Sequence, residues 1–110
     1  MAKFLFTNFG SAALAETVAA VDTTLTLVAG QGSLFPAPGP GEVAALVLRK
    51  PDGTPEIMHC TARVGDVLTV VRAQEGTVAQ EWVVTGGGDP VLVSNRVTAA
   101  FLNGLTWSAE

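Results

Sequence analysis

The chain has 110 residues, of which 48% are hydrophobic and 15% are charged, and its formal net charge is -4. This length allows folding to bury about 60 to 70% of the unfolded surface, so we predict a single domain over residues 1–110. The acidic balance and the scattered basic residues argue against nucleic acid as a partner. No apolar run reaches the roughly 20 residues that a membrane-spanning helix needs.

The N-terminal residues 1–10 concentrate aromatic side chains, with Phe4, Phe6 and Phe9 ahead of the turn-forming pair Gly10-Ser11. Two interpretations stay open for this arm. It forms a first strand in the chain's own sheet, or it adds to the sheet or groove of a neighbouring subunit.

The next segment predicts two strands. Thr17–Ala20 favours extended structure through its β-branched residues. Thr24–Val28 alternates polar and apolar residues, which predicts a half-buried strand with Leu25 and Leu27 pointing inward.

A loop rich in proline and glycine follows over residues 29–41, because prolines remove backbone donors and glycines admit unusual backbone angles. Leu34 and Phe35 are its large apolar residues. We expect them to pin the loop onto the core, with direct contact to a partner as the alternative.

Three consecutive antiparallel strands are the most strongly indicated elements. The apolar run Val43–Leu48 predicts a buried strand, and Pro51–Thr54 is a turn signature that folds the chain back onto a strand beginning near Ile57. The pair Gly65-Asp66 then predicts a tight hairpin turn.

This turn sets a register in which Val64 pairs with Val67, Ala62 with Thr69, and Cys60 with Val71. One face of the hairpin then carries small and aliphatic residues and is expected to be core: Met58, Cys60, Ala62, Val64, Val67 and Val71. The other face is mixed and is expected to be covered by something else: Ile57, His59, Thr61, Arg63, Leu68, Val70 and Arg72.

Beyond the hairpin, Val78–Val84 predicts a strand with Trp82 as its large apolar member. Residues 86–90 form a glycine-rich connection, and Val91–Val93 resumes an extended run. Residues 98–105 resemble a short helix that Gly104 ends, and Trp107 follows near the terminus. The predicted fold is mainly β: a small antiparallel β-sandwich or partly open barrel with a short C-terminal helix.

Chemistry-bearing patterns are sparse. Cys60 is the only cysteine, which excludes an intrachain disulfide and fits synthesis in a reducing cytoplasm. His59 adjoins it, but adjacent strand residues point to opposite faces, so a Cys-His nucleophile fails on geometry. No metal-ligand spacing or serine elbow occurs, and nothing selects the carboxylates of Asp66 and Glu75. We therefore predict no catalytic residues, no metal ligands and no cofactor.

Several segments in order resemble a small module common in structural proteins of tailed bacteriophages, where it often forms the virion-proximal attachment part of tail fibres. The segments are Phe6–Ala15, Thr24–Leu27, Gly30–Pro36 and, most specifically, Thr61–Thr77 with its Arg72-Ala-Gln-Glu-Gly-Thr corner. The resemblance implies a non-enzymatic virion component. The chain departs from the pattern at Val78–Trp82, and it has no long fibre continuation.

The resulting hypothesis is a virion protein, made in the host bacterial cytoplasm, that docks on tail or major capsid proteins as an adaptor and forms a homo-oligomer. Capsid decoration as a cement protein is the alternative. A further alternative is a carbohydrate-binding or host-surface-binding β module that stacks sugars on Trp82 and Trp107. The interface candidates are Phe4, Phe6, Phe9, Leu34, Phe35, Arg63, Leu68, Val70, Arg72 and Trp107.

Overall fold

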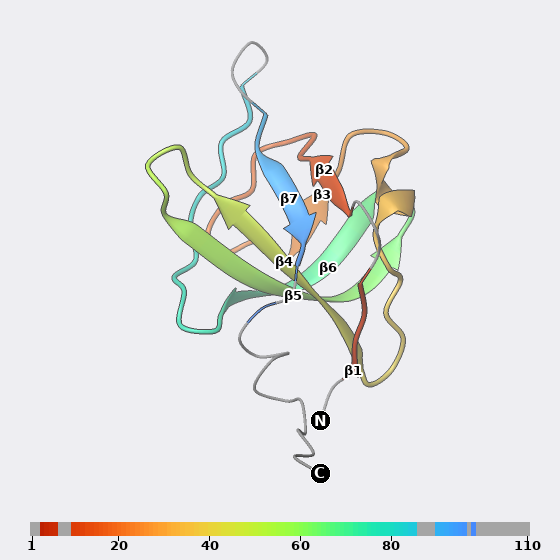
Figure 1. Cartoon of the computed structure of the whole chain (residues 1–110). Coiled ribbons are helices and arrows are strands. Elements are labelled where there is room, and N and C mark those ends of the chain that lie inside the picture. The colour runs from red at the N-terminus through yellow and green to blue at the C-terminus, as the bar shows by residue number, and fades with distance from the viewer. Residues whose placement is uncertain (1–2, 7–9, 86–89, 97, 99–110) are drawn as a thin grey trace.

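The computed structural model describes residues 3–6, 10–85, 90–96 and 98. One sheet curls into a half-barrel, as predicted for a mainly β fold (Figure 1). Its strands are β1 (Lys3–Phe4), β2 (Ser11–Ala13), β3 (Thr24–Thr26), β4 (Glu42–Arg49), β5 (Pro55–Val64), β6 (Val67–Gln74) and β7 (Leu92–Asn95). A 3-10 helix, η1 (Gln31–Leu34), follows β3. Apart from Thr98, the helix predicted over residues 98–105 lies outside the described residues.

The strand order is β2-β7-β4-β5-β6-β3, and the paired strands on this path are antiparallel. A bridge between Leu14 and Leu27 links the two ends of this path, so the sheet wraps around its own interior. That interior is mainly aliphatic, with Phe35 and Trp82 as its aromatic members, and buries side chains from each strand of this path or its flank: Ala12, Leu14, Leu25, Leu27, Leu46, Leu48, Met58, Cys60, Leu68, Val70 and Val93. The predicted inward orientation of Leu25 and Leu27 is confirmed.

The predicted meander is confirmed as β4, β5 and β6. At the first turn, the Asp52 carboxylate accepts a hydrogen bond from the Thr54 amide at 2.9 Å, and Gly53 takes a φ of 96°. At the second turn, Gly65 takes a φ of 60°, which glycine adopts at little steric cost. Two glycines at left-handed angles therefore set both reversals of the chain.

The predicted faces of the hairpin are wrong in β6 and at the end of β5, because the β5–β6 ladder contains a shift of register between Cys60 and Ala62. The pairs Val64 with Val67 and Ala62 with Thr69 are as predicted, but Cys60 then lies opposite Val70 instead of Val71. An extra residue in one strand exchanges the faces beyond it. Leu68 and Val70 are therefore core residues, whereas Val64, Val67 and Val71 are exposed.

The N-terminal arm belongs to the chain's own sheet, the first of the two interpretations. β1 pairs in parallel with β4, with Lys3 beside Glu42 and Phe4 beside Val43. Phe35 is buried and pins the loop over residues 29–41 as expected, but Leu34 is exposed.

The strands predicted over Thr17–Ala20 and Val78–Val84 are wrong as elements, since each contributes only one residue to a bridge between Val18 and Trp82. Both residues are nevertheless buried. The Arg72 side chain holds both segments against the sheet, since it donates to the carbonyls of Ala19 and Gln80.

Candidate functional site

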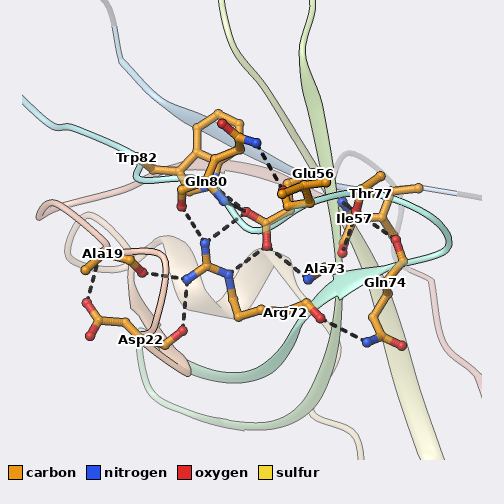
Figure 2. A network of polar contacts seen from close by, with 11 residues as sticks. Ala19, Asp22, Glu56, Ile57, Arg72, Ala73, Gln74, Thr77, Gln80 and Trp82 are labelled. Atoms are coloured by element: carbon orange, nitrogen blue, oxygen red, sulfur yellow. Dashed lines mark hydrogen bonds and ion pairs between the residues drawn. The ribbon is translucent and has the colours of Figure 1, made fainter.

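The most elaborate polar site of the described chain is a buried ion pair between Glu56 of β5 and Arg72 of β6. Arg72 Nε donates to Glu56 Oε2 at 2.8 Å, and Arg72 Nη2 donates to Glu56 Oε1 at 2.9 Å (Figure 2). The Glu56 side chain is 0% exposed and the Arg72 side chain is 7% exposed. This bidentate geometry is the strongest form of an arginine–carboxylate contact.

The Glu56 carboxylate accepts further hydrogen bonds from the Ala73 amide, the Gln80 amide and the Trp82 indole N–H, at 3.1, 2.9 and 2.8 Å. Figure 2 shows these donors converging on the two oxygens from different segments. Burial raises the pKa of the Glu56 carboxyl, but the bonds from Arg72, Trp82, Gln80 and Ala73 outweigh it and hold the pKa below its ordinary value. Glu56 is therefore ionised when the chain is folded at neutral pH.

Arg72 also anchors both irregular segments through backbone carbonyls. Its Nη1 donates to the carbonyls of Ala19 and Asp22 at 2.7 and 2.9 Å, and its Nη2 donates to the Gln80 carbonyl at 2.6 Å. With the two Glu56 bonds, every N–H of the guanidinium has an acceptor. The role of this network is structural: it joins the ends of β5 and β6 to the segments that carry Val18 and Trp82.

The sequence alone does not single out this pair, since Glu56 is one of ten acidic residues in the chain and no spacing selects it as the partner of Arg72. A stronger signal was available in the strand alternation. Glu56 has the same parity as Met58 and Cys60, which were predicted to face the core. The roles of Gln80 and Trp82 carried no such signal, because they depend on the path of an irregular segment.

A second polar cluster lies on the outer side of the sheet. His59 Nε2 and Glu75 Oε2 are 2.9 Å apart, and the Thr98 hydroxyl donates to the same oxygen at 2.6 Å. The Phe4 ring meets the His59 ring edge-on, with 5.4 Å between centroids. This cluster connects the N-terminal strand with Thr98 near the C-terminal segment, so Glu75 has a structural role.

The hairpin turn carries a third polar contact. Asp66 accepts hydrogen bonds from the Gly30 and Gly32 amides at 3.1 and 2.8 Å, and these bonds hold the pKa of its carboxyl below the ordinary value. Gly32 packs so closely that an added Cβ would lie 2.1 Å from the Gly65 carbonyl oxygen. The turn and the loop are thus fastened together through backbone atoms.

The predicted interface residues divide into three groups. Phe35, Leu68, Val70 and Arg72 are buried in the chain's own interior, so they offer no surface to a partner, and this part of the prediction is wrong. Their burial follows from the register shift, from the curvature of the sheet and, for Arg72, from the acceptors around it. Phe9 and Trp107 lie outside the described residues.

The remaining candidates keep some exposed surface. Phe6 and Leu34 are 36% and 41% exposed, and Phe4 is partly covered by His59. Arg63 is half-buried and donates from Nη1 to the Gly65 carbonyl at 3.0 Å. Its Nε is buried with no hydrogen-bond partner among the described residues.

An exposed aliphatic surface lies on the outer side of the β5–β6 hairpin. It consists of residues that the sequence pattern predicts to face the core. Val64, Val67 and Val71 are 80%, 40% and 48% exposed, and we call them the valine face. Val64 and Val67 are cross-strand partners, and Val71 follows on the same side of β6, with exposed Thr69 between them. This is the apolar surface that sequence reasoning assigned to the wrong side of the hairpin.

Within the part of the chain that the structure describes, no cluster of three or more His, Cys, Asp or Glu residues has the geometry of a metal site. No helix in that part is long and apolar enough to cross a membrane. Cys60 is buried, which raises the pKa of its thiol, and its Sγ lies 3.2 Å from the Ala62 carbonyl oxygen. No protein-family model matches the sequence, and no curated protein matches it.

Proposed function

We propose that this protein is a non-enzymatic structural component of a tailed-bacteriophage particle, an adaptor that docks on a tail protein through the valine face. The observation that carries the proposal is the exposure of Val64, Val67 and Val71 on one side of the β5–β6 hairpin. Aliphatic side chains exposed together on a rigid element are typical of protein–protein contact surfaces. The resemblance of the Thr61–Thr77 segment to phage attachment modules supports the same assignment.

The hairpin is a well-supported platform for such docking. Its open end is held by the Glu56–Arg72 pair, and its turn is held by the bonds from Asp66 to Gly30 and Gly32. A surface that is rigid before binding loses little conformational entropy on assembly. We also propose that the protein is a homo-oligomer on the particle.

The use of the acidic side chains also supports a structural role. Glu56, Glu75 and Asp66 each accept at least two hydrogen bonds from the chain itself. Each of these carboxylates thereby holds separate segments of the chain together, which is a structural use.

The direct test is composition of the particle. Virions of the phage whose genome encodes this chain are purified and analysed by quantitative mass spectrometry. We expect to find the chain among the particle proteins. A copy number far below that of the major capsid protein indicates a tail position, whereas near-equal numbers indicate the alternative, capsid decoration. Absence of the chain from purified virions would overturn the proposal.

The docking surface is tested by the triple variant Val64→Thr, Val67→Thr and Val71→Thr. We expect it to fold and to be depleted from particles, because threonine keeps the shape of valine but not its apolar surface. Val21→Thr is the matched control, since Val21 is 86% exposed in a different segment. Normal incorporation of the triple variant would reject the valine face and leave the virion assignment intact.

The carbohydrate-binding alternative loses one of its two proposed residues. Trp82 is only 2% exposed, its indole N–H donates to Glu56, and Lys50 Nζ lies 4.6 Å from its ring centroid. The ring therefore has no open face for a sugar. The other residue, Trp107, lies outside the described residues.

A further inference from the structure

A shallow groove crosses the outer side of β4 and β7, away from the valine face. Two of its lining residues come from β4 and the others from β7 and its flanks: Val47, Arg49, Pro90, Leu92, Ser94 and Arg96. Alternate residues of a strand point to the same side, so these positions form one continuous surface. Val47 and Ser94 lie at the centre of the groove, with a guanidinium toward each end.

The strand register gives the spacing of the two arginines. Val47 lies opposite Ser94 in the antiparallel β4–β7 pair, and continuing this pairing sets Arg49 near Leu92 and Arg96 near Ala45. The Arg96 backbone amide donates to the Ala45 carbonyl at 3.1 Å, which agrees with this placement. Positions four residues apart along a strand are separated by about 13 Å.

The charge of the groove stands out in an acidic protein. The chain carries a net charge of -4, yet none of the described residues that line this groove is acidic. Among the described residues neither Arg49 nor Arg96 forms an ion pair, and Arg49 makes only a hydrogen bond to the Gly53 carbonyl at 2.9 Å. Two guanidiniums without a carboxylate partner among the described residues, with Val47 and Leu92 beside them, are complementary to a ligand that combines negative charge with apolar surface.

We propose that this groove binds an extended acidic segment of a partner protein, with two carboxylates four residues apart and an apolar side chain midway between them. In an extended chain these positions point to one side and span the same distance as Arg49 and Arg96. The carboxylates pair with the two guanidiniums, and the central side chain packs on Val47, which lies midway along the groove opposite Ser94. This surface is separate from the valine face, so the inference does not rest on the proposed virion function.

The test is an NMR titration of the full chain with the blocked peptide Glu-Thr-Val-Thr-Glu. We expect saturable shifts of the β4 and β7 amides, with binding that weakens as salt is raised. Arg49→Gln and Arg96→Gln should each weaken binding about two- to fivefold, the range for a solvent-exposed ion pair. Lys3→Gln is the matched control, because Lys3 is an exposed cation on β1 that does not line the groove.

Two comparison ligands make the result decisive. The peptide Gln-Thr-Val-Thr-Gln should leave the β4 and β7 amides unshifted, and acetate at equal carboxylate concentration should shift them far less than the acidic peptide does. Shifts that are absent, that persist equally in both arginine variants, or that acetate reproduces in full would overturn the proposal. None of these results bears on whether the chain is found in virions.

Discussion

The two ends of the β5–β6 hairpin reverse the usual distribution of polar and apolar residues. At the open end, a glutamate and an arginine are buried, with Glu56 0% and Arg72 7% exposed. At the turn end, Val64 is 80% exposed on the outer side. The buried charges are tolerated because every N–H of the Arg72 guanidinium donates to an acceptor and the Glu56 carboxylate accepts five hydrogen bonds. These bonds replace the hydration that both groups lose on burial. The exposed valine side chains are not covered by other described parts of the chain, and we propose that a partner protein covers them on assembly.

The largest expected effect comes from breaking the buried pair. Arg72→Met leaves the buried Glu56 carboxylate without its cationic partner and removes the donor to Ala19, Asp22 and Gln80. We expect the free energy of unfolding to fall by about 3 to 5 kcal/mol, measured by urea denaturation. Arg96→Gln, an exposed arginine, should change it by less than about 0.5 kcal/mol. Equal effects of the two variants would show that the pair contributes little.

The same pair predicts an acid sensitivity. The pKa of Glu56 is lowered in the folded chain, so its stabilising contribution is complete above its ordinary pKa of 4.5 and is lost as the pH falls through the lower folded value. Thermal melts between neutral and acidic pH should show this loss in the wild type. In Glu56→Gln the corresponding part of the pH dependence should disappear, and an unchanged profile would contradict the assignment.

The turn end is tested by Gly32→Ala. The new Cβ would meet the Gly65 carbonyl oxygen at 2.1 Å, and both groups belong to backbone that is fixed by Asp66. We expect a destabilisation of about 1 to 3 kcal/mol, the usual cost of overpacking, measured by urea denaturation. Gly39→Ala is the control, since its Cβ would meet only the Glu42 side chain at 3.5 Å. A neutral Gly32→Ala would mean that the turn and loop are free to separate.

The smallest effect on stability is expected on the valine face. Val67→Thr and Val71→Thr should each change the free energy of unfolding by no more than about 0.5 kcal/mol, because both side chains face outward. Val70→Thr, on the inner side of the same strand, should cost several times more, since it buries a hydroxyl. Similar costs on both sides, again by urea denaturation, would show that the outer valines are part of a core.

Much of the fold was predictable because its signals are local. The two glycine-containing turns, the apolar run of β4 and the alternation in β3 depend on neighbouring residues, and the meander follows from them. The same local signals failed for Thr17–Ala20 and Val78–Val84. Their β-branched composition favours extended structure, but only the bridge between Val18 and Trp82 gives them a strand partner.

The candidate surfaces were less predictable, because a face depends on register. The residues Leu68, Val70 and Arg72 were correctly grouped on one side of β6, yet that side is the interior, since one irregularity after Cys60 shifts the pairing. The Arg49–Arg96 groove joins residues of β4 and β7 that are far apart in sequence. No spacing rule links such residues before the strand order is known.

The sequence by itself determined that this chain is a small β domain built on a meander, since turn chemistry and strand periodicity act over a few residues. Only the tertiary structure decided which side of each strand is inside, which carboxylate meets Arg72, and which aliphatic side chains remain at the surface. These outcomes depend on the bulge in the hairpin and on the curvature of the whole sheet, and both arise from contacts between segments distant along the chain.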